Sequence, residues 1–198
     1  MNKIKFKMKT QTIIAFKFLL VMTILTGIAY PFFITGVAQL VFPAKANGSL
    51  VLKDGKIIGS RLIGQKFDSI IYFWSRPSAI GYNPVPSGAS NYGPTSDTLK
   101  KQVKARSLLF MSKNLITDNT AIPKEMIFAS GSGLDPHISP EAALLQLERV
   151  AAARNLNEPQ KQKVKQLIKI KTEEPQFFFF GEPRINVFEL NLALDEIK

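Results

Sequence analysis

The chain opens with an apolar stretch that is too long for the core helix of a small domain. The 25 residues from Phe18 to Phe42 carry no formal charge. As an α-helix rising about 1.5 Å per residue, they would span roughly 37 Å, enough to cross a hydrocarbon core of about 30 Å. The pattern predicts a transmembrane helix over 18–42.

Within this segment, small or backbone-altering residues recur at every fourth position: Thr23, Gly27, Pro31 and Thr35. Residues four apart share a helix face, and small side chains there let another helix approach closely. Pro31 also removes a backbone donor next to the carbonyl of Gly27. We expect Gly27, Pro31 and Thr35 to face a partner helix. A lone anchor with incidental threonines is the alternative.

Beyond position 42, short apolar runs alternate with polar segments, a pattern typical of a soluble domain. Asp54-Gly55 lies between Leu50–Leu52 and Ile57–Ile58 and predicts a tight hairpin. A further apolar run is Ile70–Trp74, in which Tyr72, Phe73 and Trp74 are expected in the core and not in a binding platform. The next 22 residues, 75–96, are crowded with Gly, Pro, Ser and Asn, but their aromatic residues favour an ordered loop over a linker.

Helical periodicity and capping residues organise the remainder of the domain. Helices are predicted over 97–114, 140–154, 158–171 and 187–197. Ser139 and Asn157 each precede a Glu/Pro pair, the residues expected at a helix start. Strands are predicted over 126–129 and 177–180, the second of them buried. The fold class is therefore α+β, or α/β with a small sheet, on a single N-terminal transmembrane helix.

The charge distribution orients the anchor. The chain has 26 Lys and Arg against 15 Asp and Glu. Five lysines precede the first acidic residue and lie within the first 17 positions: Lys3, Lys5, Lys7, Lys9 and Lys17. Positive flanks stay inside, so residues 1–17 are predicted to be a cytoplasmic tail and 43–198 a single extracytoplasmic domain. The remaining charges are dispersed in sequence, which argues against a nucleic-acid binder.

A cleaved signal peptide is the main alternative to this anchor. Ala44-Lys45-Ala46 fits the A-x-A cleavage pattern. Apolar regions of signal peptides, however, are about 7–15 residues long, much shorter than this one. The length favours an uncleaved anchor.

The composition leaves little room for catalysis. There is no cysteine and only one histidine, which excludes disulfides, thiolate nucleophiles and His-rich metal centres. Ser132, Asp135 and His137 have the residue types of a hydrolase triad. They lie within one strand-to-helix turn, where convergence is sterically awkward, and no G-x-S-x-G motif is present. We interpret Asp135 and Ser139 as capping residues instead. Residues 87–91 are interpreted as a surface turn, with a small anion-binding nest as the alternative.

Several ordered segments together resemble one family, the C subunit of the bacterial Kdp potassium-transporting P-type ATPase. The matching segments are 25–31, 35–39, 46–49, 63–65, 72–78, 82–84, 87–91, 129–140 and 186–195. The basic N-terminus and the region near 111–124 are unspecific. The resemblance covers nearly the whole chain.

The resemblance implies an accessory, non-catalytic subunit in the bacterial inner membrane. The implied partners are a channel-like potassium-translocating subunit, a P-type ATPase subunit and a small helical subunit, and potassium is the ion that the complex transports. The phosphorylation chemistry then belongs to a partner, since no D-K-T-G segment occurs in this chain.

The family is also described as a catalytic chaperone that raises the affinity of the ATPase subunit for ATP. Its Ser-Gly-Gly-Ser-Asn segment is likened to an ABC signature, but this chain has Ala89 at the second glycine. The charge bias also places this segment outside, whereas ATP is inside. We therefore expect no intrinsic cofactor, and an assembly role in preference to direct ATP contact.

The partner-binding residues expected in the 75–96 loop are Arg76, Tyr82, Asn83, Ser87, Gly88, Ser90 and Asn91. Two other functions stay open at this point. One is a membrane-anchored extracytoplasmic hydrolase that uses Ser132, Asp135 and His137. The other is a module that binds anionic polymers through the net positive domain.

Overall fold

A computed structural model describes residues 2–117 and 122–197, with side chains of the first helix described from residue 9 onward. The chain divides into two compact units, Met1–Leu50 and Val51–Lys198, which are treated separately below.

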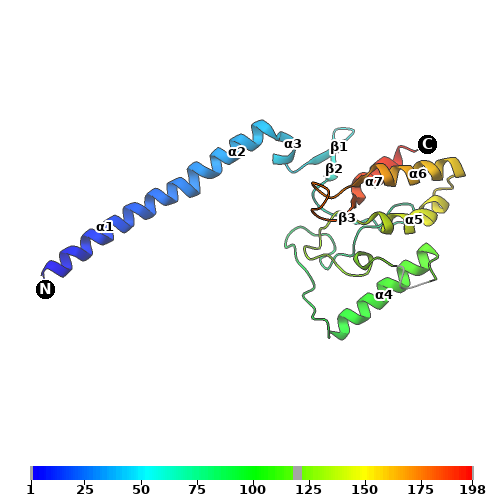
Figure 1. Cartoon of the computed structure of the whole chain (residues 1–198), viewed down its shortest axis with the longest axis horizontal. Helices are drawn as coiled ribbons and strands as arrows, with labels where there is room; N and C mark the ends of the chain where they lie inside the picture. The colour runs from blue at the N-terminus through cyan, green and yellow to red at the C-terminus, as the bar shows by residue number, and fades with distance from the viewer. Residues whose placement is uncertain (1, 118–121, 198) are drawn as a thin grey trace. The chain divides into compact units, whose positions relative to one another are not determined.

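The first unit is dominated by one long helical rod (Figure 1). It consists of α1 (Asn2–Ile24), a π-helical turn η1 (Leu25–Ala29) and α2 (Tyr30–Val41), and the short helix α3 (Pro43–Ala46) follows. In the described part of the chain, the segment Lys9–Val41 is the one helix long and apolar enough to cross a membrane, and none of its most apolar window is buried. The described chain thus has a single N-terminal helix with the length and composition expected of a membrane span, and this helix begins well before the predicted residue 18.

The π turn lies immediately before Pro31, where the sequence had indicated a disturbance. Proline has no N–H, so an unbroken α-helix would leave the carbonyl of Gly27 without its donor. In η1 the backbone hydrogen bonds span five residues instead of four, and the N–H of Tyr30 donates to the carbonyl of Leu25. The rod therefore continues through the proline without a break.

The second unit begins with the predicted hairpin. Strand β1 (Leu50–Lys53) pairs with β2 (Lys56–Ser60). The two turn residues, Asp54 and Gly55, have φ of 52° and 75°. Two positive φ angles define the turn type that matches the twist of a hairpin, so Asp-Gly is the expected pair here.

The helices of this unit agree with the sequence pattern. They are α4 (Asp97–Asn114), α5 (Pro140–Ala153), α6 (Glu158–Ile170) and α7 (Val187–Asp195), and α5 contacts both α4 and α6 (Figure 1). Ser139 caps α5 by accepting from the N–H of Ala142. Asn157 caps α6 in a reciprocal box with Gln160.

A small antiparallel sheet joins distant parts of the unit. Its strands are β3 (His137–Ile138), β4 (Thr172–Glu173) and β5 (Arg184–Asn186), in the order β3-β5-β4. His137 lies opposite Asn186, and Thr172 lies opposite Ile185. Helices segregated around a small antiparallel sheet confirm the α+β class.

Both strands predicted from short apolar runs were wrong. The 126–129 segment begins in the last residue of a 3₁₀ turn, η3 (Lys124–Met126), and forms no strand. The 177–180 segment is an exposed turn in which Phe178 is 97% exposed. Pro175 and Pro183 flank that turn, and a proline cannot supply the N–H that ladder pairing needs.

In the run Ile70–Trp74, Phe73 is fully buried, Tyr72 and Trp74 are half-buried and Ile70 is exposed. The run lies outside both sheets. Side chains take the place of a neighbouring strand. Asn191 Oδ1 accepts from the N–H of Phe73 at 2.9 Å, and Asn191 Nδ2 donates to the carbonyl of Phe73 at 2.9 Å. Gln146 Oε1 accepts from the N–H of Trp74 at 2.7 Å.

Arg149 completes this arrangement from α5. Its guanidinium donates to the carbonyls of Ile70 and Tyr72 and stacks on Trp74, with 4.4 Å from Cζ to the ring centroid. Burial lowers the pKa of Arg149 to about 10, which still leaves it charged at neutral pH. The buried cation is therefore tolerated because backbone carbonyls and an aromatic face replace its hydration.

Candidate functional site

The 75–96 loop is ordered by the glycine-rich turn at 130–134. The N–H of Ser130 donates to the carbonyl of Pro77 at 3.2 Å, and the N–H of Gly88 donates to the carbonyl of Ser132 at 3.0 Å. Gly133 has φ +70°, and a Cβ there would lie 2.6 Å from Cγ1 of Ile80. Only glycine can adopt this φ and also leave room for Ile80. The 130–134 turn therefore serves as the template against which the 75–96 loop packs.

An ion pair connects the start of the loop to the same turn. Arg76 Nη1 lies 2.7 Å from Asp135 Oδ2, and His137 Nδ1 lies 3.3 Å from Asp135 Oδ1. The backbone N–H of His137 also donates to Asp135 Oδ1. Burial alone would raise the pKa of Asp135, but the hydrogen bonds from His137 and the charge of Arg76 outweigh it and lower the pKa to about 2. Asp135 is thus a fixed anion that orients Arg76.

Tyr82 closes the loop onto Arg76 from the other side. Its hydroxyl donates to the carbonyl of Arg76 at 2.6 Å. Burial, aided by the charge of Asp68, raises the pKa of Tyr82 to about 12, so the phenol stays protonated and keeps donating. The neighbouring Asn83 Oδ1 accepts from the N–H of Val85, which makes it a turn residue.

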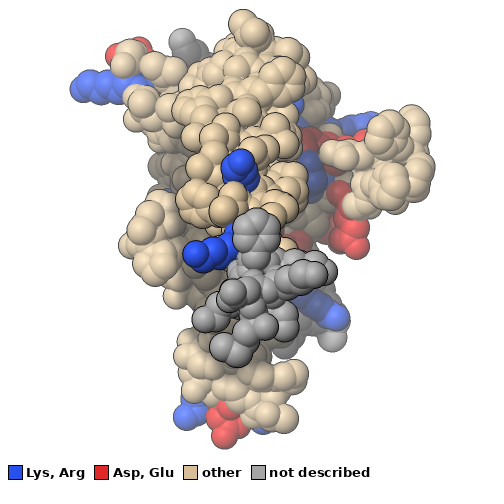
Figure 2. All heavy atoms as spheres, turned by 90° about the vertical axis from the view of Figure 1, so that its left-hand side faces the viewer, with Lys and Arg blue, Asp and Glu red and all other residues tan. Residues whose placement is uncertain are grey.

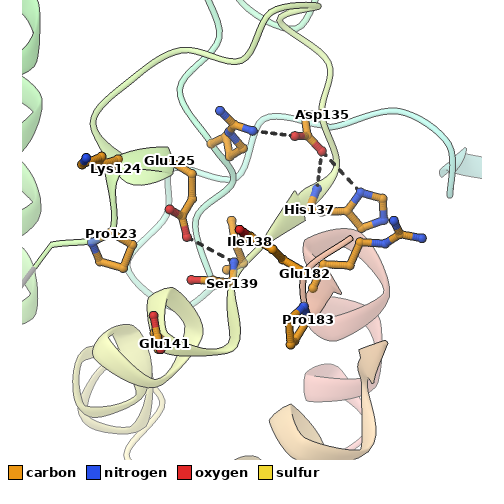
Figure 3. Close-up of a pocket in the computed structure, with 12 residues that line it drawn as sticks. Pro123, Lys124, Glu125, Asp135, His137, Ile138, Ser139, Glu141, Glu182 and Pro183 are labelled. Carbon is orange, nitrogen blue, oxygen red and sulfur yellow. Dashed lines mark hydrogen bonds and ion pairs between the residues drawn. The ribbon is translucent and has the colours of Figure 1, made fainter. Parts of the chain in front are cut away.

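Beside this ion pair lies a cavity of about 760 Å³. Figure 3 shows Asp135 and His137 on one side of it, Glu125 and Ser139 on another, and Glu182 and Pro183 across from them. Its charged or titratable residues are Arg76, Lys124, Glu125, Asp135, His137, Glu141, Glu182 and Arg184. This mixture of signs suits a polar protein surface better than a small ion of one sign. Among the described residues, no group of three or more His, Asp or Glu is arranged to hold a metal ion.

The residues considered for hydrolysis do not converge here. Asp135 and His137 line the cavity, but Ser132 is not among its lining residues. The Ser132 hydroxyl instead accepts from the N–H of Leu134 within the turn. Together with the cap by Ser139, this confirms the interpretation of 130–139 as a turn that leads into a helix.

The other expected partner-binding residues of the loop divide into inner and outer positions. Gly88 uses its N–H on the turn described above, so that donor is not free to bind an anion. Ser90 is half-buried, whereas Ser87 and Asn91 are exposed, Asn91 with φ 54°. The sequence reasoning missed Glu125, Glu182 and Arg184, because nothing in their local patterns marks them as neighbours of Arg76.

The anchor residues Gly27, Pro31 and Thr35 are all exposed, and a Cβ on Gly27 would meet nothing within 4 Å. A π turn closes on one residue more than an α turn, which offsets the residues beyond it by about 100°. In a plain α-helix Thr23 and Thr35 would point about 120° apart, but this offset returns them to within about 20°. The π turn therefore keeps the small residues on one side of the rod.

On the face shown in Figure 2, the blue and red side chains are dispersed among uncharged atoms.

Comparison with known proteins identifies the family. A family model described as "K+-transporting ATPase, c chain" matches residues 12–196. A potassium-transporting ATPase KdpC subunit from Methylococcus capsulatus is 51% identical over 184 residues, covering 91% of this chain and 94% of the relative. KdpC subunits from Polaromonas naphthalenivorans (49%, covering 90% of each chain) and Geobacter metallireducens (48%, covering 92% of this chain and 96% of the relative) are also similar. This chain belongs to the KdpC family, the c chain of potassium-transporting ATPases.

Proposed function

We propose that the protein is the accessory, non-catalytic subunit of an ATP-driven potassium-uptake complex in the bacterial inner membrane. Family membership and the Lys9–Val41 helix support this. The proposed partners are a potassium-translocating subunit, a P-type ATPase subunit that holds the catalytic site, and a small helical subunit. The lysines before residue 18 support an orientation with the N-terminus inside and the domain outside.

A reporter fusion tests the orientation. A reporter that works only outside the cytoplasm, fused after Lys198, should be active, and one that works only inside should be silent. The reverse pattern would contradict the orientation and remove the topological argument against ATP contact.

The docking surface is proposed to be the 75–96 loop together with the cavity beside Arg76. The observation that carries this is the Arg76–Asp135 ion pair, which joins the loop to the turn that leads into α5. The two segments that meet there, 72–78 and 129–140, are also among those that carry the family resemblance. A mixed-charge surface of this kind suits a polar protein–protein contact, and we assign that contact to the extracytoplasmic face of the potassium-translocating subunit.

The Arg76→Ala and Asn91→Ala variants separate two roles for this surface. If it holds the complex together, both should lower the yield of complex in mild detergent while the chain itself stays folded. If the subunit instead raises ATP affinity as a chaperone, the complex should remain intact with a raised KM for ATP. Normal yield with normal ATP dependence would refute both. His137→Ala is the control for the hydrolase alternative, which requires complete loss of activity.

The anchor is proposed to pack against a helix of a partner along Thr23, Gly27, Pro31 and Thr35. The alignment produced by the π turn supports this. Gly27→Leu should reduce co-purification with the partners, because the leucine side chain would hold the two helices apart. Insertion into the membrane should be unaffected, since lipid accommodates a leucine side chain. Gly36→Leu is a matched control, since Gly36 lies off the stripe and is equally open in the chain. Equal co-purification of both variants would reduce the anchor to a tether.

A further inference from the structure

Four consecutive phenylalanines project from the turn between β4 and β5. Phe177, Phe178, Phe179 and Phe180 are 77%, 97%, 72% and 59% exposed. Because a phenylalanine side chain offers about 150–250 Å² of surface, the apolar area they expose is on the order of 600 Å². That equals the largest apolar patches found on soluble monomers, and patches of that size are usually functional.

The turn forms several backbone hydrogen bonds within itself. The N–H of Phe178 donates to Pro175, and the N–H groups of Phe179 and Phe180 donate to the carbonyl of Gln176. Gln176 in turn donates to the carbonyl of Phe180 at 2.9 Å. Three of the four N–H groups of Phe177–Phe180 are thus bonded within the turn, which lowers the cost of moving this segment out of water.

The rings form a convex cluster rather than a groove. Phe179 and Phe180 have centroids 4.2 Å apart, and Phe177 meets Phe180 edge-on at 6.4 Å. Both Phe177 and Phe178 adopt positive φ, 52° and 68°, a conformation that bulky residues avoid. The fold thus holds these exposed rings on a backbone conformation that has an energetic cost.

The charges around the tip point to a ligand that is held by apolar contact. Glu173 and Arg184 at its base pair with each other at 3.0 Å. The closest other charged residues in sequence, Glu174 and Glu182, are acidic and exposed. The charged residues that flank the tip in sequence therefore offer no unpaired positive charge to anionic headgroups, so lipid contact should depend on burial of the rings.

The N-terminal membrane helix keeps the domain close to a bilayer. The membrane helix ends at Val41, and the second unit begins at Val51. Fewer than ten residues separate them and include the short helix α3, so the start of the domain can lie no more than about 30 Å from the end of the membrane helix. This short connection keeps the domain at a high local concentration relative to the bilayer, which makes even weak insertion effective.

We propose that the Phe177–Phe180 tip inserts into the interfacial layer of the outer leaflet and is a second membrane contact of the domain. Acyl chains suit a convex apolar tip because they adapt to its shape, whereas a protein would need a preformed pocket around all four rings. The insertion depends on the rings and not on lipid charge, so phosphatidylcholine is sufficient.

Fluorescence quenching tests this in the full chain reconstituted in phosphatidylcholine nanodiscs, with and without brominated acyl chains. Trp74 is the single natural tryptophan, so the wild type supplies the baseline. Phe178→Trp places a probe at the most exposed ring. Leu115→Trp, at a position 83% exposed beyond α4, is the matched control. Since interfacial side chains reach about 5–10 Å into the headgroup and acyl boundary, brominated lipid should quench roughly half or more of the emission added by Phe178→Trp.

The Leu115→Trp emission should not change with bromination. Quenching of Phe178→Trp no greater than that of Leu115→Trp would overturn the proposal. A blue shift of Phe178→Trp that appears only after the other subunits of the ATPase are added would also overturn it, and would assign the tip to a protein pocket.

Discussion

The amide of Asn191 is expected to be the most consequential polar group in the domain. It is 1% exposed and bonds both the N–H and the C=O of Phe73, which is fully buried. Asn191→Ala leaves both backbone groups without a partner in a site closed to water. Because each unsatisfied buried group costs about 1–3 kcal/mol, the free energy of unfolding should fall by about 4 kcal/mol.

Denaturant unfolding of the full chain in detergent measures this loss, with Trp74 fluorescence as the probe next to the altered site. Asn157→Ala is the matched control: Asn157 also accepts a backbone hydrogen bond, but at the exposed start of α6, where loss of a cap costs about 1 kcal/mol. A loss for Asn191→Ala no larger than for Asn157→Ala would refute the reasoning, since it would mean that the Phe73 backbone finds other partners.

The remaining predictions concern the turn that supports the 75–96 loop. Gly133→Ala should destabilise the domain by more than 1 kcal/mol in the same unfolding assay, because positive φ and the contact with Ile80 both oppose a Cβ. Gly131→Ala, which meets no atom within 4 Å, should change stability little, and equal effects would contradict the template role of Gly133. Asp135 has a folded pKa of about 2 against an ordinary 3.8, so its carboxylate stabilises the fold above about pH 4, and this contribution disappears as the pH falls toward 2. The wild type should lose about 2 kcal/mol over that interval relative to Asp135→Asn. Parallel pH profiles of the two proteins would show that the contacts of the Asp135 carboxylate with His137 and Arg76 add nothing to stability.

Much of the architecture was predictable because its signals are local. The membrane helix follows from an uninterrupted apolar run, the hairpin from Asp54-Gly55, and the starts of α5 and α6 from Ser139 and Asn157. Each of these signals acts within a few residues of the structure it produces. The same is true of the disturbance at Pro31, which the chain absorbs as a π turn.

Prediction failed where the burial and hydrogen-bond partners of an apolar run depend on distant parts of the chain. The 177–180 run has the composition of a buried strand. It cannot extend the sheet, because β4 and β5 are short and the flanking Pro175 and Pro183 lack the N–H that strand pairing needs. Phe73 is buried as expected, yet no local pattern reveals that Asn191 supplies its backbone hydrogen bonds from 118 positions away.

The cavity beside Arg76 was likewise only partly predictable from local sequence. The sequence singled out Arg76, and it also indicated a capped turn around Asp135 and Ser139. Only the tertiary structure brings Glu125 and Glu182 to the same place, because their positions depend on packing between segments far apart in the chain. Local chemistry determined which elements form, whereas the burial of backbone groups that need partners decided which distant side chains meet.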